Sequence, residues 1–267
     1  MSKSVSIAKF NDHVVNEDSC YTSGTCIAVS DGAGGCGLFA DEWSRYLVDK
    51  LPKDLPIKTF AELDEWIDGI WEPFYKEHEA KAKEGDSMLL NKFYDEGSCA
   101  TMAAAWKKSD TECCWIAYGD SVVFHYNNVT RILEHSCTTH LTDFSKPPYL
   151  ISTNVPLEEV GFRGGVFTTD KDSIVFAASD ALSHYILMMY ELSKCNEYHK
   201  ELKELRDQLS LNTQLLMTAE KQKIDFKNNV IDTLFSKMES PETFTEYMKE
   251  LYGSGVVDID DYTLVVM

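Results

Sequence analysis

Acidic side chains beside apolar runs are the residues of this chain best suited to chemistry. Most of them follow or precede β-branched runs such as IAVS and IVFAAS, which are typical of strands. Carboxylates at strand ends, with no histidine or cysteine in matching positions, form the oxygen-ligand set that Mg²⁺ or Mn²⁺ prefers. The pattern therefore predicts metal-assisted hydrolysis. The candidate residues are Glu17, Asp18, Asp31, Asp180 and Asp260.

A predicted hairpin places two of these carboxylates at one end of a sheet. Strand-like runs at residues 18–21 and 26–30 flank a turn at Ser23-Gly24. Pairing about this turn sets Asp18 opposite Val29 and brings it close to Asp31. This register makes a metal shared by Asp18 and Asp31 geometrically reasonable.

Composition excludes several classes of partner and compartment. The chain has 267 residues, and its net charge of −19 would be repelled by nucleic acids and anionic membranes. No run approaches the roughly 20 apolar residues of a membrane span, and the amino end lacks a signal-peptide core. Eight irregularly spaced cysteines predict reduced thiols and a cytoplasmic location.

The predicted elements come in blocks, which favours an α+β fold. Apolar alternation predicts strands at residues 4–10, 18–21, 26–30, 98–106, 113–118, 122–126, 129–133, 166–169, 173–178 and 262–266. Helical spacing predicts helices at residues 38–51, from 59 to about 74, 183–221, 229–238 and 241–253. Pro73 is expected to kink or shorten the second helix. A leucine stripe in the third long helix favours packing within the chain over a coiled-coil dimer, so a monomer is expected.

Six short motifs, taken in order, resemble the type 2C family of metal-dependent protein phosphatases. They are NED at 16–18, SDGAGG at 30–35, GSCAT at 97–101, YGDS at 118–121, SDAL at 179–182 and DDYT at 260–263. The resemblance spans nearly the whole chain. It implies one domain over residues 1–267 with a four-layer α-β-β-α sandwich around two central antiparallel sheets.

The resemblance also implies a two-metal centre holding Mn²⁺ or Mg²⁺. Asp31 would bridge both ions, the Gly32 carbonyl would bind one of them, and Asp180 with Asp260 would complete the other. Asp120 would help Asp180 to hold a third, weaker metal. The carboxylates at positions 17 and 18 would hold waters at the metals or bind directly. The implied ligands are Glu17, Asp18, Asp31, Gly32, Asp120, Asp180 and Asp260.

Three positions depart from the family pattern. His13 stands where the family carries an arginine that binds the substrate phosphate, and imidazole cannot reproduce the bidentate contact. Ala33 replaces a histidine proposed as a general acid in eukaryotic members, which leaves leaving-group protonation to water at the metals. Ala181 replaces a glycine, so the backbone there must avoid positive φ. His13 stays a candidate phosphate contact, and with Asp18 and Asp31 it completes the catalytic set.

Other interpretations of single residues stay open. Asp31 alone could be a turn residue, Asp120 could begin a hairpin, and Asp258, Asp260 and Asp261 could be a solvated entrance to an edge strand. Because side chains alternate along a strand, Asp258 and Asp260 lie on one face and Asp261 on the other, and only one face can bind the metals. The resemblance to the family selects Asp260.

The expected function is that of a serine/threonine phosphatase. It would act on phosphoserine or phosphothreonine proteins through hydroxide generated by two divalent ions. No cysteine is followed six residues later by arginine, which excludes the cysteine-dependent route. Two alternatives remain: a catalytically silent binding module and a small-molecule phosphohydrolase.

Overall fold

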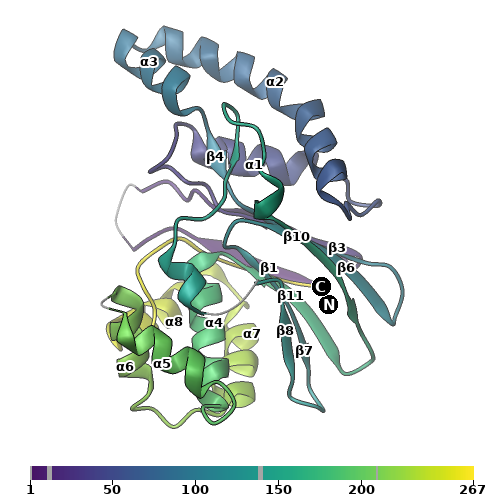
Figure 1. Cartoon of the computed structure of the whole chain (residues 1–267), viewed down its shortest axis with the longest axis vertical. Coiled ribbons are helices and arrows are strands. Elements are labelled where there is room, and N and C mark those ends of the chain that lie inside the picture. Colours follow the sequence, from purple (N-terminus) through teal and green to yellow (C-terminus); the bar gives the residue numbers. More distant parts are fainter. Residues whose placement is uncertain (1, 11–13, 138–140, 209) are drawn as a thin grey trace.

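Two five-stranded antiparallel sheets lie face to face in the computed structural model, which describes residues 2–10, 14–137, 141–208 and 210–267 (Figure 1). One sheet has the order β1, β12, β11, β7, β8, and the other has the order β10, β6, β5, β3, β2. The bounds of the first are Lys3–Ile7, Tyr262–Val266, Ser173–Ala178, Val122–Asn127 and Leu133–His135. Those of the second are Phe162–Thr168, Glu112–Tyr118, Met102–Lys107, Cys26–Ser30 and Ser19–Thr22. A small pair, β4 (Cys99–Ala100) and β9 (Ile151–Ser152), lies beside them.

The central strands are buried on both faces, because each is covered by the other sheet and by helices. In β3, Ile27 and Val29 pack between the sheets, while Cys26 and Ala28 face the helical layer. This alternation is the two-residue period of a strand. Both faces of such a strand are apolar, so the sequence reads as a continuous hydrophobic run.

Helices α1 (Ala40–Lys50) and α2 (Phe60–Glu84) cover the outer face of the second sheet, and α3 (Ser87–Glu96) packs on α2 (Figure 1). A capping box at Thr59 and Glu62 starts α2 as expected. Pro73 does not end the helix, which continues for eleven more residues to Glu84. The sequence did not predict α3.

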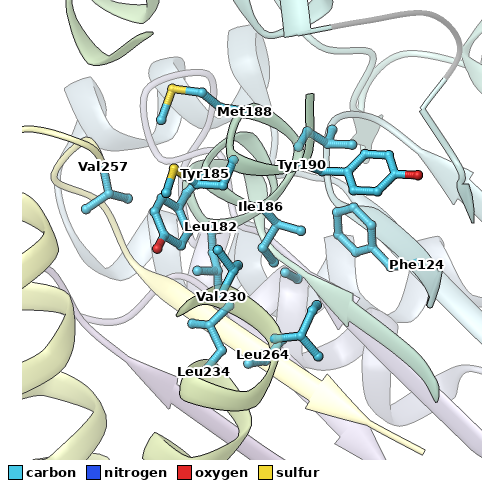
Figure 2. Packing of buried hydrophobic residues seen from close by; sticks show 14 of the residues in the cluster. Phe124, Leu182, Tyr185, Ile186, Met188, Tyr190, Val230, Leu234, Val257 and Leu264 are labelled. Atoms are coloured by element: carbon cyan, nitrogen blue, oxygen red, sulfur yellow. The ribbon is translucent and has the colours of Figure 1, made fainter. Parts of the chain in front are cut away.

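Among the described residues, five helices form the layer over the outer face of the first sheet. They are α4 (Asp180–Ser193), α5 (His199–Asp207), α6 (Leu211–Ala219), α7 (Asp232–Lys237) and α8 (Pro241–Gly253). A π-helical turn, Phe226–Ile231, precedes α7. Figure 2 shows Phe124 and Leu264 of the sheet packed against Ile186 of α4 and Leu234 of α7. The resulting α-β-β-α layering confirms the predicted fold class.

The single long helix predicted at residues 183–221 is wrong, since three helices replace it. A turn at Lys194–Tyr198 ends the first, and the Ser210 side chain caps the start of α6. Leu202, Leu205 and Leu216 of the leucine stripe are buried in one intramolecular core, as expected, and Leu209 lies outside the described residues.

The predicted register of the first hairpin is also wrong. Cys20, and not Asp18, lies opposite Val29. The Ser23 hydroxyl accepts hydrogen bonds from the amides of Thr25 and Cys26 at 3.3 and 3.0 Å, so Ser23 opens the turn instead of standing at its centre. Because Ser19 lies opposite Ser30, the observed register places Asp18 opposite Asp31, one residue beyond the paired part of β2.

Four further strand boundaries differ from the prediction, and the first is the end of β1, which lies at Ile7 instead of residue 10. The Asn127 side chain accepts from the amides of Val129 and Thr130 and extends a turn, so β8 begins only at Leu133. The predicted strand at 98–106 is divided into β4 and β5, and β10 begins four residues earlier than expected. Within the described ranges, no helix combines the length and the apolar character needed to cross a membrane.

Candidate metal centre

The candidate carboxylates lie at the ends of strands that the fold brings to one place. Asp180 follows β11 and begins α4, and Asp260 stands two residues before β12. The Ser179 amide donates to the Thr263 carbonyl at 3.1 Å, and the Thr263 amide donates to the Ser179 hydroxyl at 3.0 Å. These two bonds hold the end of β11 beside the start of β12, so Asp180 and Asp260 leave adjacent strands at the same edge.

A second set of hydrogen bonds positions Asp31 and Asp120. The Thr101 amide donates to the Asp31 carbonyl at 2.8 Å, and the Asp31 amide donates to the Thr101 hydroxyl at 3.2 Å. That hydroxyl also bonds the Ser121 hydroxyl at 2.7 Å. The end of β3 is thereby tied to the tight turn between β6 and β7, where Asp120 lies. Gly119 in this turn has φ 103°, a conformation that favours glycine.

Electrostatic coupling shows how close these carboxylates are. Burial raises the pKa of Asp31 well above its usual value, and the nearby charges of Asp18, Asp180, Asp120 and Asp260 raise it further. The pKa of Asp180 is raised by burial and then by the same neighbours, Asp120, Asp260 and Asp18. Five of the predicted acidic residues therefore share one site, although they are scattered over more than 240 residues of sequence.

Asp18 is the most deeply buried of these acids. Neither of its carboxylate oxygens has a hydrogen-bond partner of normal geometry. Burial raises the pKa of Asp18 to about 7; the nearby hydroxyls of Thr263 and Ser179 oppose the shift, and the charges of Asp261 and Asp260 add to it. Buried acceptors without donors are costly, so this carboxylate has unused capacity for a cation or a water molecule.

The carboxyl group of Asp120 also has a raised pKa. Burial raises its pKa to about 6, and the nearby Arg163 guanidinium opposes the shift. The alternative interpretation, that Asp120 only begins a hairpin, accounts for its place in the turn but not for its coupling to Asp180.

A backbone hydrogen bond joins Gly32 to Glu17. The Gly32 amide donates to the Glu17 carbonyl at 3.1 Å, and the Ser44 hydroxyl donates to the same carbonyl at 2.6 Å. A Cβ at position 32 would lie 2.6 Å from the Ala40 carbonyl oxygen, so no larger residue fits. The Gly32 carbonyl accepts from the Gly34 amide at 3.2 Å and keeps a second lone pair for another partner.

The Glu17 carboxylate lies at the margin of the cluster. It packs against Gly34, where a Cβ would stand 2.0 Å from Glu17 Oε1. Burial raises its pKa, while the neighbouring Lys9 opposes the shift and Asp261 adds to it.

Asp261 is a site residue that the sequence interpretation missed. It is only 4% exposed, and its carboxylate accepts from the amides of Lys9 and Glu17 at 2.8 and 2.7 Å. It fixes the segment that carries Asp18 next to the end of the chain. The adjacent pair Asp260-Asp261 was the signal available in the sequence. Adjacent side chains of an extended segment point to opposite sides, and here Asp260 points to one side while Asp261 binds backbone amides on the other.

Lys9 provides a positive charge at the centre. Its ammonium lies 2.8 Å from Asp260 Oδ1. His13, the predicted phosphate contact, lies outside the described residues.

The donor set fits a hard divalent cation, because it consists of carboxylates and a backbone carbonyl. In the described part of the chain, no three His, Cys, Asp or Glu side chains are gathered tightly enough to form a complete coordination shell. One of the candidate ligands, Asp260, is engaged by its ion pair with Lys9.

Ala181 obeys the backbone constraint expected from the sequence. Among the described non-glycine residues, only Phe39 and Arg131 have positive φ. The alanine therefore fits the first turn of α4 without strain, and this departure from the family motif has no structural cost.

Comparison with solved structures identifies the fold. The catalytic domain of the serine/threonine phosphatase PstP, in complex with two manganese ions, matches 100% of this chain and 96% of its own, with a TM-score of 0.54 and 15% identity. The chain has the fold of this phosphatase. PstP/Ppp of Mycobacterium tuberculosis matches with a TM-score of 0.52, 15% identity and coverage of 100% and 97%.

PppA, described as a key regulatory component of T6SS in Pseudomonas aeruginosa, matches with a TM-score of 0.52, 16% identity and coverage of 100% and 96%. The phosphatase fold expected from the six motifs is thus confirmed over the whole chain. No family model matches the sequence, and no curated protein matches it either. The likeness lies in the arrangement of elements, while most side chains differ.

Proposed function

We propose that residues 1–267 form one metal-dependent serine/threonine phosphoprotein phosphatase domain. The observation that carries this proposal is the convergence of five carboxylates, one buried and four half-buried, from separate strand ends. Like charges held together away from water are costly, and a function that recruits cations explains why the chain keeps them. The shared fold with PstP, whose structure contains two manganese ions, supports the same interpretation.

In the proposed site, each residue has a definite role. Asp31 would contact both cations, the Gly32 carbonyl one of them, and Asp180 with Asp260 the other. Asp120 would pair with Asp180 at a third, weaker position. Two bound divalent cations would supply Lewis acidity and charge neutralisation for attack of water on phosphorus.

The remaining side chains of the site act on water and on the framework. The Asp18 oxygens, which lack partners, would accept hydrogen bonds from the attacking water and orient it, with Glu17 at the margin of the same cluster. Asp261 would keep the segment carrying Asp18 in place through its two backbone contacts.

We further propose that the protein acts on phosphoserine or phosphothreonine proteins as a cytoplasmic monomer, with Mn²⁺ or Mg²⁺ as cofactor. All eight cysteines are free thiols, which supports a reducing compartment. The net charge of −19 argues against nucleic acids or anionic membranes as partners.

A catalytically silent binding module is the second candidate. The observation that favours it is the ion pair between Lys9 and Asp260, which already neutralises one candidate ligand. A module of this kind would bind a phosphoprotein without hydrolysing it.

Hydrolysis of para-nitrophenyl phosphate and of a phosphothreonine peptide separates the two candidates. We expect the EDTA-treated protein to be inactive, and Mn²⁺ at about ten times its measured dissociation constant to restore phosphate release. Binding of the phosphopeptide without any Mn²⁺-dependent release would establish the binding module instead.

Replacing Lys9 with glutamine is expected to tighten Mn²⁺ binding by about threefold. The ammonium contacts Asp260 at a partly exposed ion pair, so it competes with the cation for the same carboxylate. Isothermal titration of Mn²⁺ into the EDTA-treated protein measures the change. Lys3→Gln, at an exposed position of β1, is the matched control. Weaker binding by Lys9→Gln would show that the lysine positions Asp260 instead of competing for it.

A further inference from the structure

A cavity of about 350 Å³ opens beside Asp120. One part of its wall is apolar and consists of Phe144, Pro147, Pro148, Tyr149 and Val160. A cavity of this size is sufficient for one large amino-acid side chain, and apolar walls with few polar groups are typical of ligand pockets. The cavity was not foreseen from the sequence, because its walls come from the irregular segment after β8 and from the turn before β10.

The walls are held in place by close packing. Gly161 lies so near Tyr149 and Tyr118 that a Cβ there would approach them to 2.7 and 2.8 Å. The rings of Tyr118 and Tyr149 meet edge to face at 6.4 Å, and the Glu158 amide donates to the Tyr118 hydroxyl at 2.9 Å. Tyr149 is therefore fixed against β6, and the cavity is a preformed feature.

The two cations of the lining, Lys146 and Arg163, each have one partner already. Lys146 Nζ pairs with Asp143 Oδ1 at 3.0 Å, and the Arg163 guanidinium donates to the Gly119 carbonyl. With Asp120 also present, the charges of the lining balance. An ionic side chain would gain little here, whereas an apolar one would leave water for the apolar wall. Arg163 Nε is buried without a partner, so an acidic side chain is the competing occupant.

Asp120 connects the cavity to the carboxylate centre. It lines the cavity and is also electrostatically coupled to Asp180. Consecutive residues of an extended peptide are about 3.3 Å apart along the chain. A residue next to a phosphorylated side chain at the centre can therefore reach this neighbouring cavity.

We propose that this cavity is a subsite for a bulky apolar side chain that flanks the phosphorylated residue of the substrate. The inference rests on the proposed phosphatase function and specifies its substrate: phosphothreonine or phosphoserine next to a residue such as leucine. Occupancy of the cavity would add binding energy remote from the reacting phosphoryl group and so raise kcat/KM.

Three phosphothreonine peptides test the subsite, identical except for leucine, serine or glutamate on both sides of the phosphothreonine. We expect kcat/KM to be about tenfold higher for the leucine peptide than for the serine peptide. Val160→Gln makes one wall polar and is expected to reduce this ratio at least about threefold. Val166→Gln is the matched control: Val166 is 57% exposed, Val160 is 67% exposed, and Val166 lies outside the cavity on β10. We expect the control to keep the full ratio.

A wild-type ratio near one, or a ratio that survives Val160→Gln, would overturn the subsite. Preference for the glutamate peptide would also overturn it and would indicate that Arg163 selects an acid. Failure of the phosphatase function has a different signature, because neither the peptides nor para-nitrophenyl phosphate would be hydrolysed. In that case, the binding of labelled peptides is measured by fluorescence anisotropy. If the wild-type protein binds the leucine peptide more tightly than the serine peptide, and Val160→Gln does not, the subsite is retained. If the wild-type protein binds both peptides equally, the subsite is rejected.

Discussion

Replacing Asp31 with asparagine is expected to lower kcat for Mn²⁺-dependent hydrolysis of para-nitrophenyl phosphate by at least about a thousandfold. Asp31 is the residue proposed to contact both cations, and the charges of four neighbouring carboxylates raise its pKa. Asparagine keeps the shape and removes the charge. Initial rates over a Mn²⁺ titration measure the loss and separate weaker metal binding from slower chemistry.

The same substitution has a second, opposite consequence. In EDTA-treated protein, removal of one half-buried, mutually repelling carboxylate is expected to raise the free energy of unfolding, so activity and stability change in opposite directions. Asp258→Asn is the control, because Asp258 lies in the same acidic segment but outside the coupled cluster. Retention of activity within tenfold in Asp31→Asn would contradict the assigned role.

Replacing Glu191 with glutamine is expected to stabilise the protein at pH 8 by on the order of 3 kcal/mol. Glu191 in α4 is 4% exposed, and its Oε2 has no hydrogen-bond partner. Burial raises its pKa from 4.5 to about 8, and Glu201 adds to the shift. The unfolded chain releases the proton near pH 4.5 and the folded chain only near pH 8. The contribution of the protonated Glu191 to the free energy of unfolding is therefore complete below pH 4.5, and it is lost as the pH rises toward 8.

Urea denaturation at several pH values, on EDTA-treated protein, checks this prediction. The advantage of Glu191→Gln over wild type should be small at pH 4.5, grow between pH 4.5 and 8, and then level off. Glu204→Gln, at an exposed position of α5, should change the unfolding free energy by no more than about 0.5 kcal/mol. An advantage that does not depend on pH would show that packing, and not ionisation, causes the effect.

The sequence was sufficient for the layers and for most of the carboxylate centre. A strand that is buried on both faces produces an apolar run whatever its neighbours are. The sequence therefore predicted β3, β11 and β12, together with the acidic residues that follow or precede these strands. Asp18, Asp31, Asp120, Asp180 and Asp260 were predicted to share one site, and the structure brings them together. Their roles as metal ligands remain predictions.

What the sequence could not provide depends on contacts between distant residues. The hairpin register depended on one serine hydroxyl, and the role of Asp261 depended on two amides about 250 residues away. Lys9 showed no pattern of its own, because a single lysine is informative only once its partner Asp260 is placed beside it. Side-chain hydrogen bonds of this kind leave no periodic signal in a sequence.

The pairing of β1 with β12 has a consequence for synthesis. Lys3 lies opposite Val266 and Ile7 opposite Tyr262, so strands from opposite ends of the chain are direct neighbours. Asp260 and Asp261, just before β12, contact Lys9 and Glu17 near the beginning. While the chain leaves the ribosome, β1 must wait for β12 to emerge before it has its neighbour in the sheet. This late pairing is expected to slow folding.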